Sequence, residues 1–194
     1  MQTAPAPSLP PDCTGRAIDL EVVRPRLAQL SAPQRLHWGL ETFGEGFAVT
    51  TSFGIQSAVL LQMVADLAEQ TGRSLPVIWV DTGYLPPETY LYADQLVQRL
   101  KLNLVASQSP ISSARMEALH GRLWETGQAS DLELYHRIRK VEPLDRSLTD
   151  LGVTCWASGV RGSQTDHRRT METLDSVRQR WSLRPLLAWS KREV

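Results

Sequence analysis

The residues best suited to chemistry form a short loop between two regular elements. An apolar strand over residues 47–49 runs into the small and polar stretch 50–57, and a strong apolar helical pattern begins at Ser57. The first N–H groups of a helix have no partner within the helix, and the aligned peptide dipoles place positive charge there. Hydroxyl donors and Gly54 favour close approach of a ligand. This arrangement predicts a phosphate or sulfate site, with an ordinary strand–helix turn as the alternative.

This loop differs from the common nucleotide-binding loops. It has no lysine, and it matches neither G-x-x-x-x-G-K-[ST] nor G-x-G-x-x-G. Its interpretation therefore depends on what other segments bring to the same place.

A second polar group follows the next apolar strand, residues 75–80. Asp81, Thr82 and Gly83 come directly after it. Strands that alternate with helices predict a parallel sheet with right-handed crossovers, and ligands bind beyond the carboxyl ends of its strands. We therefore expect Asp81 to meet a polar ligand group, with a cap or turn residue as the alternative.

Two further segments supply positive charge. Residues 136–140 hold one histidine, two arginines and Lys140, which form either a solvated helical face or a surface for an anion. A strand over residues 153–158 is followed by Arg161, Gln164 and Arg168. Arginine binds phosphate and sulfate in a bidentate way and stays charged near neutral pH. We expect these segments to converge with the helix start on a strongly anionic small molecule.

Composition narrows the classes of protein. The 194 residues include 21 Lys plus Arg and 21 Asp plus Glu, and a formal net charge of zero argues against a protein that coats nucleic acid. The length suits one domain with a sizeable core. The sequence contains neither an apolar stretch of membrane-spanning length nor the apolar core of a signal peptide. Cys13 and Cys155 have no metal or disulfide spacing, so we expect a cytoplasmic, reduced protein.

The elements that position these segments follow from cap signals and hydrophobic period. Asp19 caps a helix over residues 20–30, and Ser31 opens a second helix that ends at Gly44. Four prolines among the first eleven residues predict a flexible tail over residues 1–17, ahead of a single domain over 18–194.

The second half of the chain continues the alternation. It predicts a strand over residues 102–105 and helices over 89–100, 112–123 and 132–151, the last restarted or kinked at Pro143. Alternation in the strand 153–158 puts Val153, Cys155 and Ala157 on one face. We interpret Cys155 as an inert core residue and Cys13, in the tail, as incidental.

Four segments together resemble the phosphoadenylyl-sulfate (PAPS) reductase family. The stretch T-S-F-G-I-Q-S (51–57) is similar to its modified PP-loop, and D-T-G-Y-L-P-P-E-T-Y (81–90) to its second block. R-K-V-E-P-L (139–144) resembles the third block, and G-V-R (159–161) with Gln164 and Arg168 the fourth. The blocks occur in the family's order across roughly residues 35–189.

The resemblance implies an α/β fold of the adenine nucleotide alpha hydrolase-like type (PP-loop, Rossmann-like), with a mostly parallel sheet flanked by helices. It implies reduction of PAPS to sulfite and adenosine 3′,5′-bisphosphate in assimilatory sulfate reduction and cysteine biosynthesis. Thioredoxin is the implied electron donor and partner, with no bound cofactor, no nucleic acid or membrane partner, and a homodimer left open. The implied substrate-binding residues are Thr51, Ser52, Phe53, Gly54, Gln56, Ser57, Asp81, Thr82, Gly83, Leu85, Lys140, Arg161, Gln164 and Arg168.

The cysteines distinguish this chain from one related type. Iron–sulfur adenylyl-sulfate (APS) reductases carry a Cys-Cys pair just before the R-K-V-E-P block and a later C-x-x-C. Tyr135 and His136 stand near the first place, and nothing matches the second. Two distant cysteines cannot supply four thiolates, so we expect no iron–sulfur cluster, no metal, and the 3′-phosphorylated substrate.

The family's nucleophile is a cysteine in a C-terminal E-C-G-[IL]-H tail, which these 194 residues do not contain. Ser190 and Glu193 match a helix-start signal, from which we infer a truncated chain without its own catalytic residue. The alternatives are a non-catalytic PAPS or adenine-nucleotide-binding module and an APS reductase without a cluster. A PP-loop nucleotidyltransferase, such as a sulfate adenylyltransferase subunit, is a further alternative that the absent lysine disfavours.

Overall fold

The computed structural model describes residues 8–194. Within this range no helix is both long and apolar enough to cross a membrane. The elements in chain order are α1 (Leu20–Gln29), α2 (Ala32–Phe43), β1 (Phe47–Thr51), α3 (Ser57–Thr71), β2 (Pro76–Asp81), α4 (Pro87–Leu100), β3 (Asn103–Gln108), α5 (Ser113–His120), α6 (Ala129–His136), the π-helical turn η2 (Arg137–Val141), α7 (Glu142–Asp150), β4 (Cys155–Ser158), α8 (Asp166–Arg169), β5 (Leu174–Val177) and β6 (Arg180–Leu183), with 3₁₀ turns η1 (Gly44–Gly46) and η3 (Gly162–Gln164).

The strands form one sheet in the order β3-β2-β1-β4-β6-β5. Its neighbours are parallel except for the antiparallel pair β5 and β6, which confirms the expectation of a mostly parallel sheet. The chain proceeds from β1 outward to β2 and β3, and then crosses back to β4 on the other side of β1. The strand order therefore reverses between β1 and β4, and the carboxyl ends of those two strands are where a sheet of this kind binds its ligand.

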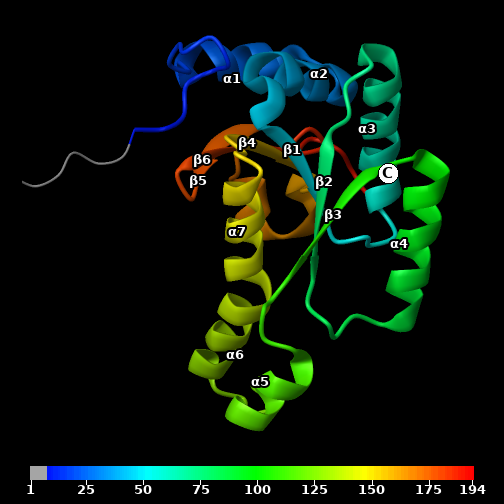
Figure 1. Ribbon diagram of the computed structural model, residues 1–194. Coiled ribbons are helices and arrows are strands. Elements are labelled where there is room, and N and C mark those ends of the chain that lie inside the picture. Colours follow the sequence, from blue (N-terminus) through cyan, green and yellow to red (C-terminus); the bar gives the residue numbers. More distant parts are fainter. Residues whose placement is uncertain (1–7) are drawn as a thin grey trace, which may run out of the picture.

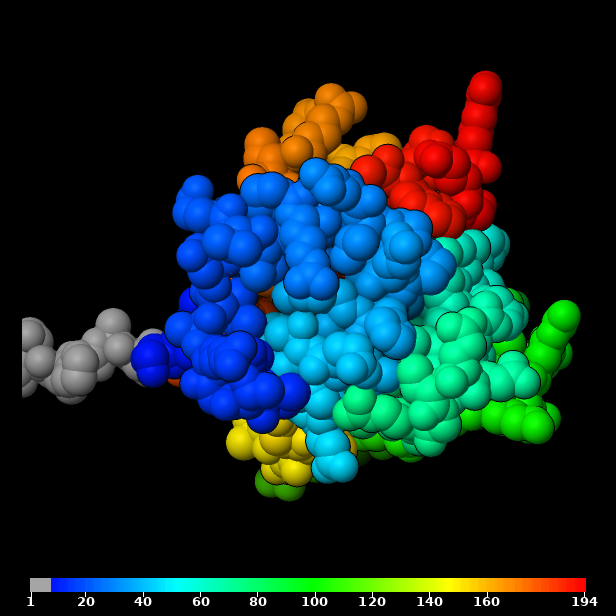
Figure 2. Space-filling view, turned by 90° about the horizontal axis from the view of Figure 1, so that it is seen from above, coloured from blue at the N-terminus to red at the C-terminus, as the bar shows by residue number. Residues whose placement is uncertain are grey.

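Helices cover the two faces of the sheet unequally. One face packs against α1 to α4 in the larger apolar cluster, which includes Leu36, Val49, Leu61 and Val77. The other face packs against α7 through Ala48, Ile78, Leu148 and Trp156. Figure 1 shows α7 alone in front of the sheet, with α5 and α6 extending below it. Figure 2, seen from above, shows the blue residues of α1 and α2 lying over the middle of the molecule beside α3.

The first two helices begin where their cap residues predict. The Asp19 carboxylate accepts a hydrogen bond from Glu21 N–H, and Ser31 and Gln34 form a reciprocal capping box. These bonds satisfy N–H groups that the first turn of a helix leaves without a partner. Gly44 follows Phe43 with φ of +57°, a backbone conformation that glycine adopts readily and that ends α2.

The expected long helix over residues 132–151 is three elements. A π-helical turn, Arg137–Val141, separates α6 from α7, and Pro143 lies in the first turn of α7. A proline has no N–H and fits the first turn of a helix. The π-helical turn is the part that the sequence pattern did not predict, because it depends on the packing of Ile138 and Arg139 rather than on helix propensity.

In the C-terminal half, one prediction is wrong and one element was not predicted. Val153 does not share a face with Cys155 and Ala157: it precedes β4 and packs in the cluster beneath α7, whereas the other two pack in the larger cluster. The β5–β6 hairpin was also missed. Its four-residue strands contain polar residues and lack the Asn-Gly or Asp-Gly turn that signals a hairpin.

Residues 8–17 contact the folded body, and the flexible tail over 1–17 stays a prediction; residues 1–7 lie outside the described residues. Trp181 donates from Nε1 to the Pro10 carbonyl at 2.8 Å, and Cys13 N–H donates to the Thr42 carbonyl at 2.8 Å. The Asp12 carboxylate accepts N–H bonds from Thr14 and Arg16. These hydrogen bonds hold the segment along the folded body.

The other end of the described chain contains the expected cap contact in part. Ser190 N–H donates to the Glu193 carboxylate at 2.7 Å, within a turn. Nearer the body, Gly162 N–H donates to the Leu187 carbonyl at 2.8 Å and the Ser163 hydroxyl to the Trp189 carbonyl at 3.3 Å. The C-terminal segment thus lies against the loop that follows β4.

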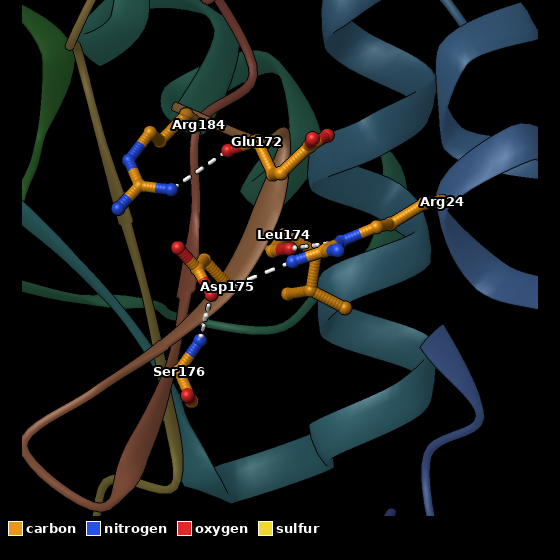
Figure 3. A network of polar contacts seen from close by, with 6 residues as sticks. All are labelled: Arg24, Glu172, Leu174, Asp175, Ser176 and Arg184. Atoms are coloured by element: carbon orange, nitrogen blue, oxygen red, sulfur yellow. Dashed lines mark hydrogen bonds and ion pairs between the residues drawn. The ribbon is translucent and has the colours of Figure 1, made fainter. Parts of the chain in front are cut away.

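A polar network joins α1 to the edge of the sheet (Figure 3). Arg24 donates from Nε to the Leu174 carbonyl at 3.1 Å and pairs with Asp175 at 3.4 Å. The buried Arg184 donates from Nη1 to the Glu172 carbonyl at 2.7 Å. These contacts cover the edge strand β5 and fix the hairpin to the N-terminal helices.

Gly39 permits the closest contact between α2 and the sheet. A Cβ atom at this position would lie 2.5 Å from Cζ of Phe47, whose side chain is only 1% exposed. We expect Gly39→Ala to lower the free energy of unfolding by about 1–2 kcal/mol, because overpacking outweighs the gain in helix propensity. Denaturant unfolding measures this change. His37→Ala, on the exposed side of the same helix, is the control and should change stability by less than about 0.5 kcal/mol; an unchanged or raised stability of Gly39→Ala would contradict the close contact.

Candidate functional site

A cleft of about 790 Å³ opens at the carboxyl ends of β1 and β4. Its wall comes from the β1–α3 loop, the end of β2, η2 with the start of α7, the segment after β4, and the β5–β6 turn. Four of its residues are cationic and none is acidic. The lining residues are Thr50, Thr51, Ser52, Gly54, Ile55, Gln56, Ser57, Leu60, Trp79, Val80, Thr82, Leu85, Lys140, Val141, Leu144, Ser158, Gly159, Val160, Arg161, Gln164, Arg168 and Arg178.

The β1–α3 loop is anchored by one aromatic side chain. Phe53 is 2% exposed, has φ of +49°, and meets Trp79 edge-to-face with ring centroids 5.1 Å apart. Its N–H donates to Thr51 Oγ1 at 3.1 Å. The Phe53 side chain therefore packs in the core and shapes the loop, and its expected contact with substrate stays a prediction.

The start of α3 offers N–H groups toward the cleft. Gln56 is the N-cap residue, and no side chain from the described part of the chain caps the helix there. Ser57 hydrogen bonds through both N–H and Oγ to the Gly54 carbonyl, at 2.8 and 2.6 Å, so its hydroxyl is available to a ligand mainly as an acceptor. A helix end with this charge and these donors suits an anion.

A side-chain bridge joins the two strands at the reversal point. Arg161, which follows β4, donates from Nη2 to Oε1 of Gln56 at the start of α3. Arg161 is 4% exposed, and its Nη1 is buried without a hydrogen-bond partner among residues 8–194. Burying a guanidinium nitrogen without an acceptor is costly, so Arg161 favours a negatively charged partner.

Gln164 organises the loop after β4. Its Oε1 accepts from Arg161 N–H at 3.2 Å and from Nη1 of Arg168. One amide oxygen thus holds two arginines of the fourth predicted segment near the cleft. Lys140 reaches the cleft from η2, and its Nζ lies 5.9 Å from the centroid of the Tyr135 ring.

Asp81 is not among the residues that line the cleft, and its expected contact with ligand stays a prediction. Its carboxylate accepts from Gly83 N–H at 2.8 Å, Tyr90 Oη at 2.7 Å and Gln108 Nε2 at 2.7 Å. Burial raises the pKa of Asp81, but the hydrogen bonds outweigh it and hold the pKa below its usual value. The alternative interpretation, a turn residue, fits these contacts. Asp81 is the ionised centre that shapes the β2–α4 loop.

Gly83 lies behind the cleft, against the buried Arg139. A Cβ on Gly83 would lie 2.5 Å from Ser113 Oγ and 2.9 Å from Arg139 Nη2. Arg139 itself donates to the Ile111 carbonyl and to Ser113 Oγ, and its guanidinium carbon lies 5.1 Å from the Tyr84 ring centroid. Gly83 is thus closely packed, and its expected substrate contact stays a prediction; Arg139 joins loops and is not among the residues that line the cleft.

The structure brings most of the predicted binding residues together on one wall. The predicted residues that line the cleft are Thr51, Ser52, Gly54, Gln56, Ser57, Thr82, Leu85, Lys140, Arg161, Gln164 and Arg168. Sequence reasoning missed others for two reasons. Thr50, Trp79 and Ser158 lie in the C-terminal halves of β1, β2 and β4, where the alternation of faces was not followed. Arg178 gave no local signal, because its hairpin was not predicted.

Neither cysteine lines the cleft. Cys155 is fully buried in β4, and burial raises the pKa of its thiol well above the usual value despite a weaker opposing hydrogen bond with the Leu183 backbone. Cys13 is exposed and lies against α2, where its Sγ is 3.4 Å from the Glu41 carbonyl. Within the range 8–194, no three His, Cys, Asp or Glu side chains are grouped as metal ligands.

The fold and the cleft define an α/β protein with a cationic cleft at a strand–helix junction, at the carboxyl ends of β1 and β4. Comparison with known sequences and structures supports this class. The phosphoadenosine phosphosulfate reductase domain matches residues 46–194, and the chain belongs to the phosphoadenosine phosphosulfate reductase family.

Individual relatives agree with this assignment. The chain is 51% identical over 175 residues to the phosphoadenosine 5′-phosphosulfate reductase of Synechococcus sp., covering 90% of this chain and 74% of that protein. It is 45% identical over 176 residues to the Shewanella oneidensis enzyme of the same name, covering 91% and 70%. The crystal structure of PAPS reductase from Candida auris has 23% identity, a TM-score of 0.76, and coverage of 96% and 85%. This likeness confirms the expected adenine nucleotide alpha hydrolase-like fold.

The two thiols should differ sharply in reactivity. We expect Cys13 in the native protein to react with iodoacetamide at pH 8 at least about a hundredfold faster than Cys155, because a buried thiol of raised pKa provides little accessible thiolate. Mass spectrometry of peptides sampled over time measures both rates. The denatured protein is the control, in which the rates should converge. Rapid native labelling of Cys155 would show that β4 opens to solvent.

Proposed function

We propose that this chain binds PAPS in the cleft and serves its reduction to sulfite and adenosine 3′,5′-bisphosphate in sulfate assimilation, with thioredoxin as electron donor in the cytoplasm. Its membership of the family supports the reaction. One observation supports the ligand class: the buried Nη1 of Arg161 lacks a partner among the described residues beside an uncapped helix start. An anionic group is the natural partner for both.

The proposed binding mode divides the substrate between the two walls. The phosphosulfate lies at the α3 start, near Ser52, Gln56 and Arg161. Trp79, Thr82 and Leu85 provide the more apolar wall expected for the nucleoside. Lys140 and Arg168 add positive charge at the rim. The packing and hydrogen bonds of Phe53, Asp81 and Gly83 support the loops around the cleft.

The proposed chemistry needs a thiolate that this cleft does not contain among residues 8–194. A thiolate attacks the sulfur of PAPS, an S–S bond forms, and the S–O bond breaks as adenosine 3′,5′-bisphosphate leaves. A thioredoxin thiolate then attacks the protein sulfur and releases sulfite, and a second thioredoxin thiol resolves the mixed disulfide. The resemblance assigns the first thiolate to the E-C-G-[IL]-H tail.

Nucleotide preference tests the proposed substrate. We expect adenosine 3′,5′-bisphosphate to bind more tightly than AMP, because the extra phosphate meets a cleft with four cations and no carboxylate in its wall. Arg161→Ala should weaken binding of the bisphosphate by about 1.5–3 kcal/mol, the worth of a charge-assisted contact. Isothermal titration calorimetry measures both.

The exposed Arg99 at the end of α4 provides a charge-matched control. Arg99→Ala should leave both affinities unchanged within about twofold, since screening removes distant surface charges. Equal affinities of the native chain for the two nucleotides would count against PAPS, and an unaffected Arg161→Ala would remove that residue from the site.

Sulfite release tests the role of the thiols. We expect the 194-residue chain with reduced thioredoxin and PAPS to release no sulfite above background, because Cys155 is inaccessible and Cys13 lies outside the cleft wall. A version extended by a tail with E-C-G-L-H should release sulfite, since Leu187 and Trp189 place the chain beside the Arg161 loop.

Two variants of the extended version sharpen the test. Changing the tail cysteine to serine should abolish sulfite release, whereas Cys155→Ala should leave turnover largely intact. If the unextended chain turns over and Cys13 or Cys155 is required, the assignment of the nucleophile to the tail is wrong. If the chain binds adenosine 3′,5′-bisphosphate but no tail restores turnover, a binding module is the better description.

A further inference from the structure

One cation of the cleft belongs to none of the four segments that predicted the site. Arg178 lines the cleft from the turn between β5 and β6. Its Nη1 lies 3.0 Å from Oδ1 of Asp145 on α7. Val177 and Leu144 pack in the cluster on the α7 face of the sheet. Arg178 therefore approaches the cleft from the α7 side, whereas Arg161 bonds Gln56 at the start of α3.

The turn holds Arg178 in a backbone conformation that side chains disfavour. Arg178 and Gln179 have φ of +52° and +60°, and Val177 pairs with Arg180 across them. Two successive positive φ values match a type I′ turn, for which Asn and Gly are the preferred residues. Strained positions of this kind persist only where the surrounding structure over-determines them, and they cluster at ligand sites.

Contacts on both sides of the hairpin fix the turn in place. Behind it, Arg24 bonds the Leu174 carbonyl and pairs with Asp175, as Figure 3 shows. Toward α7, Arg180 donates to the Val153 carbonyl and to Thr149 Oγ1, each at 2.9 Å. The long side chain of Arg178 is thus presented to the cleft from a rigid base.

The present partner of Arg178 is one that a ligand can replace. The side chains of Arg178 and Asp145 are 37% and 41% exposed, and ion pairs at such sites contribute little to stability. Asp145 does not belong to the cleft wall. A doubly charged phosphate offers the guanidinium two oxygens in a bidentate arrangement and is therefore a stronger partner than a half-exposed carboxylate.

We propose that Arg178 binds the second phosphate of the nucleotide, the 3′-phosphate, and is the residue that sets the preference for 3′-phosphorylated substrate. This inference rests on the proposed function, which assigns the other anionic group to the α3 start and Arg161. A nucleotide that bridges the cleft presents its two anionic groups to opposite walls, and Arg178 is the cation of the α7-side wall that the hairpin fixes. Binding exchanges the Asp145 carboxylate for a phosphate.

Calorimetry on the full 194-residue chain with adenosine 3′,5′-bisphosphate and AMP tests the proposal. Arg178→Gln should lower the affinity for the bisphosphate about tenfold to a hundredfold, as expected for a lost charge-assisted contact, and change the affinity for AMP by less than about twofold. The matched control is Arg146→Gln. Arg146 is exposed, follows Asp145 on α7 and does not line the cleft, so both affinities should stay within about twofold.

The outcomes separate this inference from the proposed function. If the native chain binds both nucleotides equally, the assignment of PAPS fails. If the native chain prefers the bisphosphate and a folded Arg178→Gln keeps that preference, PAPS stands and the role of Arg178 is wrong. An equal loss of affinity for both nucleotides would also contradict the proposed role of Arg178, because it would indicate a general effect on the cleft.

A measurement on the native chain covers the case in which Arg178→Gln does not fold. Phenylglyoxal modifies accessible arginines, and peptide mapping gives the rate at Arg178. Saturating bisphosphate should slow this rate at least about tenfold, whereas AMP at equal occupancy should leave it nearly unchanged, since only the 3′-phosphate engages the guanidinium. Equal protection by both nucleotides, or by neither, would contradict the proposal.

Discussion

The site depends on one buried positive charge at the point where the strand order reverses. Arg161 is almost fully buried, and of its two terminal nitrogens one is bonded to Gln56 and the other has no partner within residues 8–194. An unpaired buried charge is unfavourable by several kcal/mol in a real protein, even after relaxation. The adjacent helix start is positive as well, so it cannot relieve this charge. The folded chain therefore favours the binding of an anion at this place.

The rest of the fold keeps Arg161 and the positive start of α3 close together although their charges repel each other. Parallel pairing sets Val49 opposite Ala157, which brings the ends of β1 and β4 side by side. Phe53 locks the intervening loop into the core against Trp79. On the neighbouring loop, the ionised Asp81 accepts three hydrogen bonds and so provides the negative charge that the cleft wall itself lacks. Packing and hydrogen bonding away from the ligand thus maintain a cleft that is electrostatically prepared for it.

Local signals predicted the parts of the site that depend on neighbouring residues in the chain. The strand–loop–helix order around Ser57 and the caps at Asp19 and Ser31 follow from short-range chemistry, and each was predicted correctly. The side of a loop toward which each residue faces was harder to predict. Phe53 and Gly83 were expected at the ligand but face the core or a second loop, because only tertiary packing decides which side of a loop is covered. No local sequence signal marks the β5–β6 hairpin, so the place of Arg178 at the cleft was not predicted either.

Residue type alone does not decide whether a cation serves the ligand or the framework. Arg139 and Arg161 are equally buried, at 3% and 4% exposure. Both terminal nitrogens of Arg139 donate to the 111–113 loop, and its guanidinium lies over Tyr84, so its charge stabilises the framework. Arg161 lines the cleft, and its terminal Nη1 has no hydrogen-bond partner among the described residues, whereas the unpartnered nitrogen of Arg139 is Nε. The difference lies in which acceptors the fold brings within reach, and that is a property of the long-range contacts between loops. A count of arginines in the sequence therefore overstates the charge offered to a ligand, because long-range contacts commit Arg139 to the framework and leave Arg161 in the cleft wall.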